Sequence, residues 1–164
     1  MLKMSLRCAA TSLMLCASLS AVAAPASTKP LVIEGVIQEF VGPAARCPSN
    51  FGGTIVGHGI SSLVGRVAFI GTDCITQNGP LFNFTEGRMT IVTAESDQIF
   101  ANYSGQFVPT GQGANFVFSN ATFQITGGTG RYKKASGGGS FTGDEDMGTG
   151  AGTIKLTGQI TFKE

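Results

Sequence analysis

The chain has 164 residues, of which 42% are hydrophobic and 13% are charged, and its formal net charge at pH 7 is +1. This size predicts a single domain with a core of its own, and 12 Phe with no Trp make that core aromatic and aliphatic. The near-zero charge leaves no basic surface for nucleic acid or anionic lipid, so these binding classes are excluded.

The first 23 residues have the pattern of a cleaved, Sec-type secretory signal peptide. Lys3 and Arg7 form a short positive segment, residues 8–22 are mostly apolar, and Ala21–Ala23 is a small-x-small cleavage site. The apolar segment is too short, and too often interrupted by Ser and Thr, to predict a permanent membrane span. A lipoprotein anchored at Cys16 is the alternative, which the large residue before this cysteine disfavours. We therefore expect a secreted or periplasmic protein.

Removal of this segment changes both the charge and the cysteine count. The basic residues fall from 11 to 9 against 10 acidic residues, so the remaining chain has a net charge of −1. Cys47 and Cys74 are the cysteines left, and an isolated pair in an exported protein predicts a disulfide. Metal binding is the weaker alternative because neither cysteine has a neighbouring Cys or His, and we expect no metal and no cofactor.

The rest of the chain repeats short strand-forming segments that end at Gly, Asn, Asp or Pro, without sustained helical periodicity. The last of them is the clearest, because apolar residues from Ile154 to Phe162 alternate with polar ones. Residues 24–30 are expected to form a short extension and residues 31–164 one domain. The expected strands are 31–40, 53–60, 62–71, 81–94, 98–107, 114–126, 135–143 and 153–162.

Two of these segments contain signs of irregularity. In 114–126 the apolar positions change from even numbers to odd numbers, which indicates a β-bulge or a break near Ser119-Asn120. In 81–94 an interruption at Glu86-Gly87 is the alternative to one continuous strand. Asn78-Gly79-Pro80 between two strands is a turn signal.

About eight strands with short connections favour an antiparallel meander. Closure of the sheet into a barrel removes its exposed edges, and a barrel of this size is either filled by side chains or holds one small ligand. The predicted fold class is all-β, a single antiparallel meander barrel of approximately eight strands. An open sandwich is the alternative, because alternation alone does not show closure.

A glycine-rich segment, Ile125–Tyr132, is predicted to be a tight turn between two strands. It resembles the GGTG(R/K)(F/Y) segment of the dirigent and allene oxide cyclase barrels and of small secreted bacterial proteins built like them. The resemblance covers mainly residues 97–162 and implies a calycin-like barrel in which this segment is structural. The plant relatives catalyse a cyclisation or steer radical coupling with ionisable groups inside the cavity, and the resemblance places none of those groups on this chain. The residues that carry it are Gly127, Gly128, Thr129, Gly130 and Arg131.

The inventory of reactive groups is small, and we assign no catalytic residue. The chain has one His and no G-x-S-x-G motif. The polar residues that we expect to face a cavity, if there is one, are His58, Arg66, Arg88 and Tyr103.

Acidic residues are the other candidates. Asp144-Glu145-Asp146 lies between glycines and is expected to be a solvated hairpin loop. A hydrolase with paired carboxylates needs two acids that converge, and the sequence does not show whether Glu34, Glu39 and Glu86 do so.

Three functions stay open. The leading hypothesis is a non-catalytic secreted barrel that binds a small apolar or amphipathic ligand or a surface partner. The second is an enzyme of the cyclase or isomerase type acting on a confined hydrophobic substrate, which requires a cavity with an ionisable pair of perturbed pKa. The third is a structural or envelope-interaction protein, with homo-oligomers left open, which an exposed apolar patch would favour.

Overall fold

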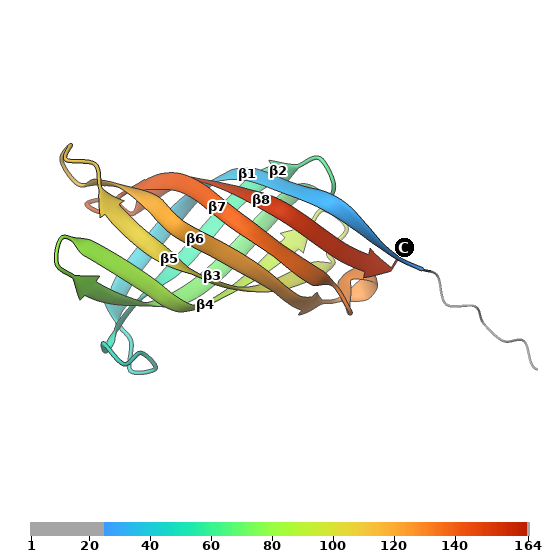
Figure 1. Cartoon of the computed structure of the whole chain (residues 1–164), viewed down its shortest axis with the longest axis horizontal. Helices are drawn as coiled ribbons and strands as arrows, with labels where there is room; N and C mark the ends of the chain where they lie inside the picture. Colours follow the sequence, from blue (N-terminus) through green and yellow to red (C-terminus); the bar gives the residue numbers. More distant parts are fainter. Residues whose placement is uncertain (1–24, 164) are drawn as a thin grey trace, which may run out of the picture.

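The computed structural model describes residues 25–163, which form a closed antiparallel barrel of eight strands (Figure 1). Each strand pairs with its neighbours in the chain, and β1 pairs with β8 to close the sheet. The predicted meander barrel is confirmed, and the open sandwich was wrong. The predicted signal peptide lies outside the described residues, among which no helix is long and apolar enough to cross a membrane.

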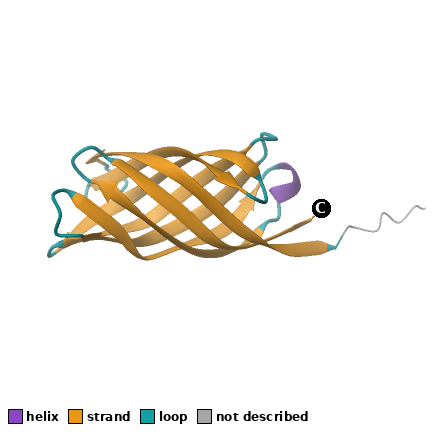
Figure 2. Ribbon diagram, turned by 90° about the horizontal axis from the view of Figure 1, so that it is seen from above, coloured by secondary structure: helices purple, strands orange, loops and turns teal. Residues whose placement is uncertain are grey.

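The strands other than β4 are longer than the sequence patterns predict. β1 begins at Ala26 because residues expected to be an extension pair with the end of β8, with Ala26 opposite Lys163. In Figure 2 this first strand projects beyond the barrel next to the C-terminal end of the chain. Pro30 is tolerated there because β1 pairs with β2 only from Ile33 onward, so Pro30 has β8 as its one neighbour. The strands are β1 (Ala26–Pro43), β2 (Phe51–Ser61), β3 (Gly65–Asn78), β4 (Leu81–Thr93), β5 (Gln98–Pro109), β6 (Asn115–Gly128), β7 (Ser136–Asp146) and β8 (Ala151–Lys163), with a 3-10 turn η1 (Gly130–Tyr132) before β7.

Aromatic side chains fill the interior of the barrel. Phe84 lies at their centre, with ring centroids 4.8 Å from Phe107 and 5.9 Å from Phe141. A cavity of about 20 Å³ remains beside them. That volume holds roughly one water, whereas sites for small organic ligands are typically about 300 Å³ or larger. The barrel is therefore filled by its own side chains and has no room for a small organic ligand.

Both predicted irregularities occur as β-bulges. The register of β4 shifts between Phe84 and Gly87, where Glu86 has a φ of 53°, and the register of β6 shifts between Val117 and Thr122, where Asn120 has a φ of 49°. The β4 bulge also shifts the pairing with β3, where Thr72 lies opposite Arg88 and Cys74 opposite Thr85. Asp73 faces inward in phase with the buried odd-numbered residues of β3, whereas Cys74 is buried where its disulfide with Cys47 attaches the loop after β1.

The GGTG segment closes one end of the barrel and is wider than the tight turn expected, since η1 follows Thr129. Tyr132 is fully buried there, and its ring lies 5.1 Å from that of Phe162. Gly130 has a φ of +49°, and a Cβ on it would collide with the carboxylate of Asp97. Glycine is therefore required at this position by both backbone and space.

Candidate functional site

Three carboxyl groups lie inside the barrel, toward the end at which β1 and β7 finish. They belong to Glu39 on β1, Asp73 on β3 and Glu145 on β7, and all three residues are buried. Tyr103 on β5 is buried beside them. We call Glu39, Asp73 and Glu145 the carboxyl cluster. Buried acids are rare unless they are paired or hydrogen-bonded, so each needs a physical account.

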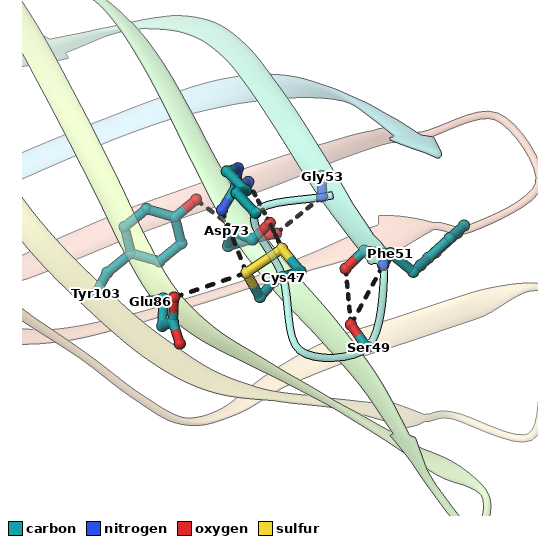
Figure 3. The surroundings of a disulfide bond; sticks show 9 residues. Cys47, Ser49, Phe51, Gly53, Asp73, Glu86 and Tyr103 are labelled. Carbon is teal, nitrogen blue, oxygen red and sulfur yellow. Dashed lines mark hydrogen bonds between the residues drawn. A yellow bond between two sulfur atoms is a disulfide. The ribbon is translucent and has the colours of Figure 1, made fainter. Parts of the chain in front are cut away.

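The hydrogen bonds of Asp73 satisfy its side chain (Figure 3). The Tyr103 hydroxyl donates to Oδ2 at 3.0 Å, and the Gly53 backbone N–H donates to Oδ1 at 3.2 Å. Arg46 donates to the Asp73 backbone carbonyl at 2.5 Å and supplies the nearby positive charge. Burial raises the pKa of Asp73, and these three groups oppose the rise. Burial and the Asp73 charge also raise the pKa of Tyr103, so its hydroxyl stays a donor.

Glu39 and Glu145 are different, because their carboxyl oxygens lack donors. Within residues 25–163, no hydrogen-bond partner reaches either carboxyl oxygen of Glu39 or Oε2 of Glu145 when both groups are ionised. The two side chains lie close enough to hydrogen-bond with each other, which requires a proton on one of them. The missing donor is thus a proton held between the two carboxyl groups.

The electrostatics place that proton on Glu39. Burial raises the pKa of Glu39 to about 10, and the charges of Glu145 and Asp73 add to the rise. Burial also raises the pKa of Glu145, to about 7, with the charges of Asp73 and Asp146 adding to it and the hydrogen bond with Glu39 opposing it. The pair therefore titrates as a unit, and at neutral pH Glu39 is the protonated member.

Glycines let the two glutamates meet across β8. Gly152 is the register partner of both Glu145 and Ile37, so β8 has no side chain between β1 and β7 at this level. A Cβ on Gly53 would collide with Oε1 of Glu39 and would lie 2.9 Å from Oδ1 of Asp73. The carboxyl cluster is therefore packed directly against backbone.

The predicted Cys47–Cys74 disulfide is present, with the two Cα atoms 5.3 Å apart. It attaches the loop after β1 to β3, next to Asp73 (Figure 3). The same loop carries Arg46. Closure of a loop with a sequence separation of 27 restricts the unfolded chain and stabilises the fold by about 3.5 kcal/mol. The disulfide thus helps to hold this loop against Asp73.

The chemistry open to this arrangement is the binding and release of a proton. Within residues 25–163 the structure has no set of three or more His, Cys, Asp or Glu side chains arranged to hold a metal ion. The carboxyl cluster is also sealed from solvent, since Glu39 and Glu145 expose only 4% and 2% of their surface.

The four predicted cavity residues do not come together. Tyr103 faces the interior, but His58, Arg66 and Arg88 are exposed on the outer wall. The prediction was wrong for these three residues because their positions in the strands face outward. His58, for example, lies between Gly57 and Gly59 and is in phase with exposed Val56 and Ile60. The acidic run at 144–146 is also corrected, because β7 extends through Asp146 and places Glu145 inside rather than in a solvated loop.

Sequence analysis missed the carboxyl cluster, although strand phase gives a signal for Asp73, which follows Val67 and Phe69 in alternation, and for Glu39. Glu39 follows Ile33, Gly35 and Ile37 in strict alternation, which marks it as inward-facing. Of the other strand acids considered, Glu34 is exposed and pairs with Lys155 at 2.7 Å, and Glu86 is exposed at the β4 bulge.

A second feature is apolar and lies on the outer wall. Five large apolar side chains from three adjacent strands are exposed there, with Phe40 at 60% and Ile60 at 67%. Val36 lies diagonal to Val56 and Ile60 across β1 and β2, and Phe40 lies diagonal to Val56. Val56 is directly opposite Ile70 across β2 and β3, so the five form one surface, with polar side chains between them. We call it the apolar outer face; it consists of Val36, Phe40, Val56, Ile60 and Ile70.

Comparison with known proteins adds no relative. No protein-family model matches the chain, and no curated protein matches it significantly. A function has to be argued from the carboxyl cluster and the apolar outer face alone.

Proposed function

We propose that this protein is an exported, non-catalytic barrel that acts by binding a partner through its apolar outer face. The observation that carries the proposal is the exposure of Val36, Phe40, Val56, Ile60 and Ile70 on three neighbouring strands. Scattered apolar residues are normal on a surface, but a contiguous group is typical of an interaction site. Export follows from the signal-peptide pattern of residues 1–23.

The interior gives less support to the ligand-binding version of this function. Its cavity of about 20 Å³ is an order of magnitude smaller than the roughly 300 Å³ of a small-molecule site. The surface partner is therefore the version that we carry forward.

Hydroxyl-radical labelling tests the proposal even while the identity of the partner is unknown. We expect Phe40, Ile60 and Ile70 to be protected in native preparations from the source organism and labelled in the purified, highly diluted chain. Val117, which is 39% exposed on β6, is the internal control and should be labelled equally in both. Equal labelling of Phe40 in both samples would reject a partner on this face.

A second candidate is an enzyme of the cyclase or isomerase type, and one observation favours it. The Glu39–Glu145 pair has pKa values pushed apart, to about 10 and about 7, which is typical of acid–base machinery. A substrate would have to displace the aromatic side chains around the small cavity. If this candidate holds, benzene should shift the NMR signals of Phe84 and Met89, which line that cavity. Unchanged signals at saturating benzene would exclude both this enzyme and an apolar ligand in the interior.

A further inference from the structure

We propose that the partner of the apolar outer face is a second copy of this chain, docked about a two-fold axis so that Phe40 of each copy fills a hollow on the other. This inference rests on the proposed function, because it names the occupant of the same face. It follows from the shape of the face, which has one projection and one depression.

The projection is Phe40, near the end of β1. Its ring is 60% exposed, and its strand neighbour is the smaller Thr54, which pairs in turn with Thr72. An aromatic side chain that stands above small neighbours has the form of an interface anchor, since aromatic residues are enriched among the side chains that dominate binding.

The depression lies on the same two strands, with Gly35 and Gly59 as its floor. These glycines are register partners, and a Cβ on either would collide with a carbonyl oxygen of the opposite strand, so the backbones lie very close. Val36, His58 and Ile60 form its walls, together with the charged residues Glu34 and Arg66. The hollow has a volume of about 320 Å³, and its surface is mostly apolar, which suits an aromatic ring.

The spacing of projection and hollow favours a two-fold arrangement. Gly35 and Phe40 lie on one strand about 16 Å apart, at roughly 3.3 Å per residue. A two-fold axis midway between them, near Val56, exchanges the two features, so that each Phe40 meets the hollow of the other copy. Such an interface is isologous: both copies bury the same surface, and the assembly stops at two copies instead of growing into a filament.

Charge does not oppose this docking. None of the five residues of the apolar outer face is charged. Glu34 and Arg66, which border the hollow, have opposite charges, and Glu34 already pairs with Lys155 of the same chain. The chain without residues 1–23 has a net charge of only −1, so two copies repel each other weakly.

Analytical ultracentrifugation of the chain without residues 1–23 is the first test. We expect a dimer at micromolar concentration and expect Phe40→Ser to weaken it by at least about a hundredfold, because each dimer loses two anchors. Val117→Ser is the matched control and should leave the dimer unchanged, since Val117 lies on β6, outside the face. A chain that is monomeric at all concentrations would overturn the inference.

A second test does not depend on the folding of the Phe40 variant. Val56 lies next to the proposed axis, so Val56→Cys should form a covalent dimer with itself on mild oxidation. Thr122→Cys, an exposed position on β6, should stay monomeric. A dimer that persists in Phe40→Ser and leaves Val56→Cys uncrosslinked would place the contact elsewhere and overturn the proposal.

The two proposals fail differently. If Phe40 is protected in native preparations while the purified chain is monomeric, the apolar outer face has another partner and only the homodimer is overturned. Flotation with phosphatidylcholine vesicles then tests whether that partner is a lipid surface. If Phe40 is labelled equally in both preparations, the proposed function fails as well.

Discussion

The barrel should be markedly less stable at pH 8.5 than at pH 5, by on the order of 5 kcal/mol. The cause is the carboxyl cluster, whose pKa values are raised in the folded state. The ordinary pKa of a glutamate is 4.5, whereas that of Glu145 is raised to about 7 and that of Glu39 to about 10. Burial is the largest cause for both groups. Above pH 4.5 the unfolded chain therefore loses protons that the folded chain keeps.

The direction of the effect follows from this difference in bound protons. The stability is fully present below the unfolded pKa and falls as the pH rises, by up to about 1.4 kcal/mol per pH unit for each group. Glu145 contributes to the fall up to about pH 7, and Glu39 up to about pH 10. Asp73, whose pKa is also raised, adds to the same trend.

Urea unfolding at constant ionic strength, repeated between pH 5 and pH 9, measures this slope. Cys47 and Cys74 are joined, so the chain without residues 1–23 has no free thiol to rearrange the disulfide at the alkaline end. A free energy of unfolding that is constant or rises with pH would contradict the protonated Glu39–Glu145 pair.

The regular part of the barrel could be predicted because it depends on short-range patterns. A period-two alternation in β8 and the change of phase in β6 give strand faces and one bulge directly. The bulge in β4 coincides with Glu86-Gly87, where glycine interrupts the strand-forming residues. Each of these signals lies within a few residues of the feature that it predicts.

The carboxyl cluster could not be predicted because it depends on register and closure. Glu39 and Glu145 come from β1 and β7, which become near neighbours only when β8 lies between them with Gly152 at their level. Asp73 is in phase with the buried odd-numbered residues of β3, but only closure of the barrel brings it next to the two glutamates. The misplaced His58 has a related cause: flanking glycines give no alternation from which to read its side.

The outer wall shows the same division between local and long-range information. Exposed apolar residues on β1, such as Val36 and Phe40, are in phase with one another, so their shared side follows from the sequence of that strand. Val56 and Ile70 extend the same surface only because β2 pairs with β3. The apolar outer face is therefore a property of the assembled sheet, as the carboxyl cluster is.

Glu39→Gln should raise the stability of the barrel at pH 8.5 by on the order of 3 kcal/mol and remove most of the fall in stability above pH 7. The amide of glutamine has nearly the same shape as the carboxyl group, and its N–H can donate to Glu145 at every pH. The variant therefore keeps the hydrogen bond of the protonated pair and removes the cost of ionising Glu39. The gain is smaller than the full linkage effect because the second amide hydrogen is buried without a known acceptor.

The matched control for this variant is Glu34→Gln on the same strand. Glu34 is exposed and its ion pair with Lys155 is a surface contact, so its loss should change the stability by less than about 1 kcal/mol and leave the pH slope intact. If Glu39→Gln instead destabilised the barrel at all pH values and kept the slope, the titrating group would be another member of the cluster. Asp73 would then be the group to replace, because its pKa is raised too and its bonds to Tyr103 and Gly53 fix it in place. The two variants thus distinguish two causes of the pH dependence. One is a proton shared by Glu39 and Glu145, and the other is the general cost of burying acidic residues in the barrel.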